Sequence, residues 1–221
     1  MSSSTRRAAL YIVLVADATA TQRVQAALAS PHVESVLICA PPGSRLDAAS
    51  ARPLVEIVQR AGVAAVIGHD AQLARTLRAD GVHIAWSNSV ADAFAEAREL
   101  LGGRAIVGAD AGTSRHDAMV LAEAGADYVS FGAAADEVSR QIRAELVAWW
   151  AEIFEVPCVA LDVTDPAEAA ALAHAGSDFI GLALPQGETL AESAARIANC
   201  LTAMRGGALD AAAARADRVA T

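Results

Sequence analysis

Histidine and aspartate residues that directly follow short apolar runs are the residues of this sequence best suited to chemistry. They are His69 with Asp70, then Asp110, then Asp162. A histidine beside an aspartate can carry a proton or bind a cation, and carboxylate oxygens are the ligands that Mg²⁺ prefers. If the apolar runs are parallel strands of one barrel, their carboxyl ends meet at one face. We therefore expect these side chains to surround a single site.

Helix capping is the alternative explanation for each carboxylate. An acid placed after a strand commonly accepts hydrogen bonds from the first turn of the following helix. For any single one of Asp17, Asp110 and Asp162 we favour capping over ligation, and a solvated loop explains His69-Asp70 about as well as a site does. His83 lies within an apolar run, so we interpret it as a packed core histidine.

The elements that must position these residues alternate regularly along the chain. Eight short apolar runs cover residues 10–15, 33–39, 63–67, 81–86, 104–107, 128–131, 158–161 and 179–182. Segments with helical spacing separate them, so the fold class is α/β and the architecture is a (β/α)8 TIM barrel. We expect one barrel domain over 9–204, with tails at 1–8 and 205–221. A doubly wound open sheet is the alternative, but it needs a glycine-rich first turn, which residues 15–18 lack.

A repeated joint between helix and strand supports the repeated unit. Residues 79–84, 124–129 and 175–180 each combine a glycine, an aspartate and an apolar run. Glycine is favoured just past a helix because it tolerates the left-handed conformation. The three joints are spaced by about two strand-helix units, which indicates an internally repeated α/β fold.

Composition excludes several classes of function. The chain of 221 residues has a net charge of −9, and its seventeen basic residues are all arginine. Scattered arginines on an acidic chain argue against a nucleic-acid partner, and the absence of lysine excludes Schiff-base chemistry. No apolar run approaches the length of about 18 residues that predicts a membrane-spanning helix, so we expect no membrane association.

The cysteines and the first apolar run bear on localisation. Cys39, Cys158 and Cys200 are an odd number without metal-ligand spacing, which is typical of core thiols in a reducing compartment. We therefore expect a cytoplasmic protein. Residues 6–18 also resemble a short secretory signal with a small-residue cleavage site, but their composition favours a first strand.

Two stretches resemble a known family. His69-Asp70 followed by residues 79–84, and the run 125–132, are similar to the thiamine phosphate synthase family and its thiazole tautomerase relatives. The resemblance extends over residues 63–182. It implies a barrel that joins a pyrimidine methyl diphosphate to a thiazole phosphate with Mg²⁺ as cofactor and with release of diphosphate. It also implies a homodimer, for which Trp149-Trp150 is a candidate contact.

The resemblance assigns roles residue by residue. It places catalytic roles at Asp70, Asp110 and His69 and magnesium ligands at Asp70 and Asn88. It places contacts to a small-molecule substrate at Asn88, Gly132, Arg140, Asp162 and Gly181.

The sequence departs from the family pattern where anions would bind. The family's Gln-x-Arg-x-Lys run corresponds to residues 37–41, which carry no cation, and its Pro-x-x-Pro-Thr segment corresponds to 133–136. The serine after the fifth strand aligns with Asp110, and the phosphate-binding Gly-Gly turn with Asp162-Val163. At an effective dielectric of about 20, a carboxylate about 4 Å from a phosphate oxygen costs roughly 4 kcal/mol.

Three hypotheses follow. The first is a diverged homologue that binds a neutral or cationic ligand. The second is an active thiamine phosphate synthase whose phosphate contacts come from Arg45, Arg115 or Arg140. The third is another Mg²⁺-assisted barrel enzyme that uses Asp70, Asp110 and Asp162.

Overall fold

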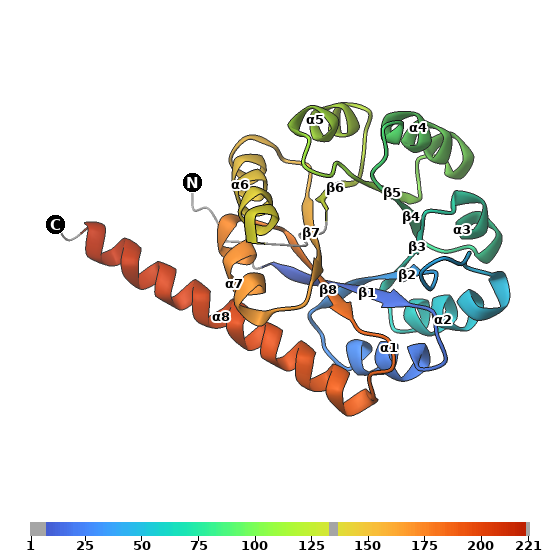
Figure 1. Ribbon diagram of the computed structural model, residues 1–221, viewed down its shortest axis with the longest axis horizontal. Helices are drawn as coiled ribbons and strands as arrows, with labels where there is room; N and C mark the ends of the chain where they lie inside the picture. Colours follow the sequence, from blue (N-terminus) through green and yellow to red (C-terminus); the bar gives the residue numbers. More distant parts are fainter. Residues whose placement is uncertain (1–7, 133–136, 220–221) are drawn as a thin grey trace.

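The computed structural model describes residues 8–132 and 137–219, with side chains for residues 8–132 and 139–206. The described residues form a closed barrel of parallel strands in the order β1 to β8, surrounded by a ring of helices (Figure 1). This closure confirms the predicted (β/α)8 barrel and excludes the open sheet.

Strand and helix bounds follow the expected alternation. The strands are β1 Ala9–Val15, β2 Val33–Cys39, β3 Ala64–Gly68, β4 Gly81–Ile84, β5 Ile106–Asp110, β6 Tyr128–Phe131, β7 Cys158–Val163 and β8 Phe179–Leu184. The helices are α1 Ala20–Leu28, α2 Ala48–Arg60, α3 Ala71–Leu77, α4 Val90–Leu101, α5 Arg115–Glu123, α6 Glu137–Ile153, α7 Pro166–Ala175 and α8 Leu190–Val219.

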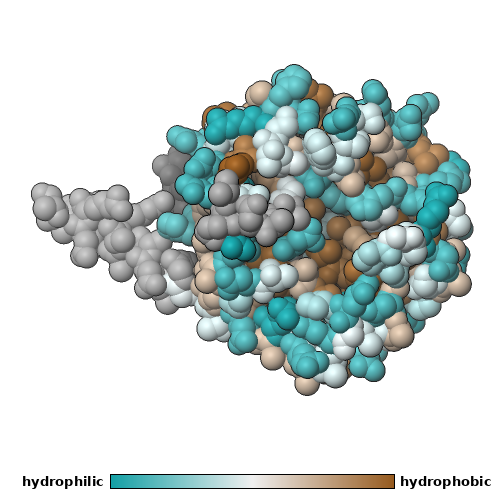
Figure 2. All heavy atoms as spheres, viewed as in Figure 1, coloured by the Kyte–Doolittle hydropathy of each residue, from teal (hydrophilic) through white to brown (hydrophobic). Residues whose placement is uncertain are grey.

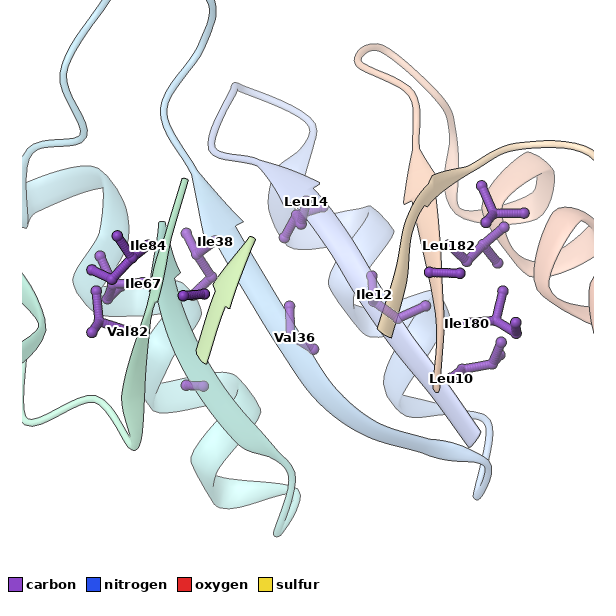
Figure 3. Packing of buried hydrophobic residues seen from close by; sticks show 14 of the residues in the cluster. Leu10, Ile12, Leu14, Val36, Ile38, Ile67, Val82, Ile84, Ile180 and Leu182 are labelled. Atoms are coloured by element: carbon purple, nitrogen blue, oxygen red, sulfur yellow. The ribbon is translucent and has the colours of Figure 1, made fainter. Parts of the chain in front are cut away.

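Alternate side chains of each strand enter two separate hydrophobic layers. One layer lies between the strands and the helices, and Figure 3 shows part of it, including Leu10, Ile12 and Leu14 from β1. The other layer fills the barrel interior, where Tyr11 and Tyr128 are its largest members. Hydrophilic residues dominate the outer surface, with hydrophobic residues visible toward the centre of the face in Figure 2. The strands are therefore apolar on both sides, as their sequences predict.

The repeated joint serves the same structural purpose three times. Its aspartate precedes an even-numbered strand, and one carboxylate oxygen accepts a hydrogen bond from a backbone N–H near the start of the preceding odd-numbered strand. The pairs are Asp80 with Ala65 N at 2.8 Å, Asp127 with Val107 N at 2.8 Å, and Asp178 with Cys158 N at 2.9 Å. These bonds tie together β3 and β4, β5 and β6, and β7 and β8 at the amino-terminal end of the barrel.

The two ends of the described chain belong to the first strand and the last helix. Residues Ala9–Val15 form β1, which pairs with β2 and β8. The apolar part of the segment that resembles a secretory signal is therefore a strand of the barrel. At the other end, α8 continues to Val219 and projects beyond the barrel (Figure 1). Residues 205–219, within the segment that we expected as a tail, are helical. Among the described residues no helix is long and apolar enough to cross a membrane.

Replacing Asp178 tests the contribution of the repeated joint. Asp178→Ala removes the partner of the Cys158 N–H, so we expect the free energy of unfolding to fall by about 1–3 kcal/mol. Asp178→Asn keeps an acceptor oxygen and should lose less. Urea unfolding followed by circular dichroism measures both. A loss below about 0.5 kcal/mol for the alanine variant would contradict this role for the joint.

Candidate functional site

Two carboxyl groups lie at the carboxyl end of the barrel. Asp110 is the last residue of β5 and Asp162 the next to last of β7, so both strands run slightly further than the sequence predicts. Asp110 shares its face of β5 with Gly108, where an added Cβ would lie 2.0 Å from the Tyr128 ring inside the barrel. Asp110 therefore points inward, and its Oδ1 accepts a hydrogen bond from Gly112 N at 2.8 Å.

The electrostatics of the two carboxyls show that they share one environment. Burial raises the pKa of Asp110 to about 6, and the negative charge of Asp162 adds to that increase. Asp162 is exposed at the surface, yet the protein atoms around its carboxyl raise its pKa by partial desolvation, and the charges of Arg143 and His69 oppose the shift. Cys39, at the end of β2, has its pKa raised to about 12 by burial and by Asp162, so its thiol is neutral. The end of the barrel is thus a partly desolvated acidic site.

Arg143 on α6 supplies a buried positive charge beneath this site. Its Nη1 donates to Leu161 O and its Nη2 to Glu168 Oε1, while its Nε has no hydrogen-bond partner among the described residues. Sequence reasoning missed this residue. The available signal is its place in the apolar stripe of α6, three and seven residues before the buried Leu146 and Trp150.

Two of the site residues have a strained backbone. His69 has φ of 63° and Asp162 has φ of 56°, in the left-handed region that non-glycine residues seldom adopt. Such strain costs about 1–3 kcal/mol per residue and concentrates at functional sites. His69 N donates to His83 O at 2.8 Å, which fixes the strained loop to β4. The His69 side chain is exposed, yet the protein atoms beside its ring lower its pKa by partial desolvation.

Below the acidic site, the barrel interior contains a polar but uncharged network. The Tyr128 hydroxyl lies 3.0 Å from His83 Nδ1 and 2.7 Å from the Tyr11 hydroxyl. Burial lowers the pKa of His83 to about 3 and raises the pKa values of both tyrosines. All three side chains are therefore neutral at pH 7, and His83 is the packed histidine that the sequence predicts.

The structure brings some of the predicted site residues together. An added Cβ at Gly132 would lie 3.2 Å from Asp110 Oδ2, so these two residues adjoin. Asp70 caps α3, because its Oδ1 accepts from Leu73 N at 2.8 Å. Our alternative for His69-Asp70 was a solvated loop, so this cap was not predicted. Asn88 is exposed in the loop after β4.

Other predicted residues lie elsewhere. Gly181 is in the middle of β8, where an added Cβ would lie 2.8 Å from Leu161 Cα, so close approach of β7 explains this glycine. Arg140 is exposed on α6, and Arg115 lies with its guanidinium 4.7 Å from the centre of the Trp149 ring. Arg45 is exposed in the loop after β2. Residues 133–136 lie outside the described part of the chain.

Magnesium binding depends on the oxygens available. Within residues 8–132 and 137–219, no three His, Cys, Asp or Glu side chains are grouped to hold a metal ion. Asp70 has one carboxylate oxygen left, because the other caps α3, and the Asn88 side chain has a single amide oxygen. A Mg²⁺ ion here would need its remaining ligands from a bound phosphate group and water. The described side chains do not by themselves form a metal site.

These features define a closed (β/α)8 barrel with two acidic residues at the carboxyl ends of its strands, the end where barrel enzymes carry their chemistry. Residues 10–183 match the family model described as thiamine monophosphate synthase. The chain belongs to this family.

Individual relatives agree with the assignment. A thiamine-phosphate synthase of Erythrobacter litoralis is 41% identical over 138 residues, which cover 60% of this chain and 63% of that protein. One from Rhodospirillum centenum is 38% identical over 159 residues, covering 70% and 74%. The match therefore spans less than two thirds of the first relative and somewhat more of the second. A solved thiamine phosphate pyrophosphorylase from Pyrococcus furiosus shares the fold, with a TM-score of 0.69, 19% identity, and coverage of 93% and 98%.

The raised pKa of Asp110 predicts a pH-dependent effect of its neutral isostere. Because the folded pKa of about 6 exceeds the ordinary value of 3.8, the folded state loses stability as pH rises through this window. Asp110→Asn should therefore raise the free energy of unfolding at pH 7.5 by about 3 kcal/mol, from about 1.4 kcal/mol per pKa unit. The gain should vanish below pH 4. Urea titrations at both pH values measure it, and an equal effect at both would disprove the shift.

Proposed function

We propose that this chain is a diverged thiamine phosphate synthase homologue whose barrel mouth binds a neutral or cationic small molecule in place of two anionic substrates. The observation that carries the proposal is the pair of desolvated carboxyls, Asp110 and Asp162, at the ends of β5 and β7. Each already resists ionisation in the free protein. A phosphate group placed beside them would add like-charge repulsion in a region of low dielectric.

The cations of the site support the same proposal. Arg143 is committed to Leu161 O and Glu168, and its charge lowers the pKa of both carboxyls. Arg115 is stacked on Trp149. At the end of β2, where the family carries its cationic run, the chain has Cys39 and then Ala40-Pro41. An anionic ligand would therefore meet few available counter-charges among these residues.

A thermal-shift panel tests the proposal. Diphosphate, thiamine and thiamine phosphate are each added at millimolar concentration, with and without Mg²⁺. We expect thiamine, which carries a positive ring, to raise the melting temperature, and we expect diphosphate with Mg²⁺ to leave it unchanged. Stabilisation by diphosphate and Mg²⁺ that exceeds stabilisation by thiamine would refute the proposal.

The second candidate is an active thiamine phosphate synthase with relocated phosphate contacts. The observation in its favour is 38–41% identity to proteins that carry that name. On this hypothesis Asp70 would keep one oxygen for Mg²⁺ while the other caps α3, and the homodimer of the family would be retained. The half-buried Trp149, which packs against Trp150 and Phe154, would be available to such a contact.

An activity assay separates the two candidates. The purified chain is incubated with the pyrimidine diphosphate, the thiazole phosphate and Mg²⁺, and thiamine phosphate is measured by chromatography. We expect no product above the uncatalysed background. Product formation that Asp70→Ala reduces at least 100-fold would establish the second candidate. Asp92→Ala, at an exposed position in the first turn of α4, is the matched control.

A further inference from the structure

A hollow at the amino-terminal end of the barrel lies away from the acidic site. Its volume is about 450 Å³, which is within the range of small-molecule sites. The end of α2 and the chain leading to β3 form one wall, and the residues that lead into β4 and β5 form the other. The hollow is lined by the polar residues Gln59, Asp80 and Arg104 and by the apolar residues Val63 and Ile106.

The turn after α2 leaves this hollow unfilled. Gly62 has φ of 74°, a conformation that favours glycine, and an added Cβ there would have no atom within 4 Å. Val63 packs against the outer hydrophobic layer and Ile106 against the interior layer, and each is only partly buried. Their uncovered surface gives the hollow an apolar side.

Asp80 borders this hollow, and its negative charge has no ion-pair partner among the described residues. In the following repeat, Arg98 of α4 forms an ion pair with the equivalent carboxylate, Asp127, at 2.6 Å. Gln59 of α2 takes the same place beside Asp80, because its Nε2 donates to Asp80 Oδ2 at 3.2 Å. Gln59 and Arg98 also each donate to a backbone carbonyl just past the next helix. The amide carries no charge, so the hollow keeps an unpaired carboxylate whose counterpart is paired.

Three polar groups on the wall have unused hydrogen-bonding capacity. Both amide hydrogens of Gln59 are engaged, which leaves its Oε1 as an acceptor. Asp80 Oδ2 accepts from Ala65 N and from Gln59, whereas its Oδ1 accepts from no described residue. The exposed Arg104 guanidinium makes no hydrogen bond or ion pair within residues 8–132 and 139–206. The hollow thus presents two acceptors and one cationic donor.

We propose that this hollow binds a small zwitterion of the class of amino acids with an apolar side chain. The carboxylate of the ligand would pair with the Arg104 guanidinium, whose planar fork matches carboxylate geometry. Its ammonium would donate to Asp80 Oδ1 and Gln59 Oε1 and would supply the positive charge that this repeat lacks. Its side chain would cover Val63 and Ile106. The net charge of −9 disfavours a plain anion, whereas a zwitterion has no net charge.

Three matched probes separate the two charges of the ligand. Norvaline carries both an ammonium and a carboxylate group, pentanoate lacks the ammonium, and butylamine lacks the carboxylate. Each probe is titrated into the isotope-labelled whole chain at pH 7.5, and backbone amide shifts are followed by NMR. We expect norvaline to bind about fivefold more tightly than either single-charge probe. The largest shifts should fall on the amides of Val63, Ala64 and Ile106.

Arg104→Gln tests the contact to the carboxylate of the ligand. Because the Arg104 side chain is exposed and has no polar partner among the described residues, this variant should keep its fold. It should weaken norvaline binding about fivefold and remove the advantage of norvaline over butylamine. Arg60→Gln is the matched control, since Arg60 is also exposed and adjoins Gln59 in the sequence but does not line the hollow. The control should change no affinity.

Several outcomes would overturn this site. They are no norvaline binding at millimolar concentration, equal affinity for all three probes, or norvaline binding that Arg104→Gln leaves unchanged. Shifts centred on Asp110 and Asp162 would also overturn it, because they would place the ligand at the other end of the barrel. The function proposed above is tested separately, with diphosphate and thiamine as its probes. Circular dichroism of each variant confirms that it is folded.

Discussion

Closure of the barrel depends on satisfying the backbone at the starts of its strands. A strand start that lacks a partner exposes a buried N–H, which costs free energy comparable to a lost hydrogen bond. The joint aspartates Asp80, Asp127 and Asp178 meet this requirement from the neighbouring strand, and each does so with a single carboxylate oxygen. The pairing register of β5 with β6 and of β6 with β7 is constant along the paired residues. It therefore also determines which residues of these strands are neighbours at the carboxyl end of the barrel.

The two ends of the barrel use aspartate in opposite ways. At the amino-terminal end, carboxylates accept backbone hydrogen bonds and join adjacent strands. At the carboxyl end, burial raises the pKa values of Asp110 and Asp162, and Asp162 lies in a strained conformation. The first arrangement stabilises the fold, whereas the second lowers its stability. This division of stability and function between the two ends is typical of (β/α)8 barrels.

The sequence predicts the barrel well because its evidence is local. Short apolar runs and the repeated joint both depend on neighbours within a few residues. The site is harder to predict, since Asp162 and Arg143 come close enough to influence Asp110 only after the chain has closed. Asp110 and Asp162 were identified because acids that follow apolar runs are visible in the sequence. Gly181 was assigned to ligand binding, but close packing against Leu161 explains it, and spacing alone does not distinguish these two uses of glycine.

The neutral network of Tyr11, Tyr128 and His83 has a consequence for the whole molecule. Because none of these groups ionises readily, they form an uncharged layer between the two ends of the barrel. Ions therefore reach the acidic site from the solvent at the carboxyl end of the barrel. Charge at the two ends still acts through this uncharged interior, because Asp110 at one end and Asp127 at the other both raise the pKa of Tyr128.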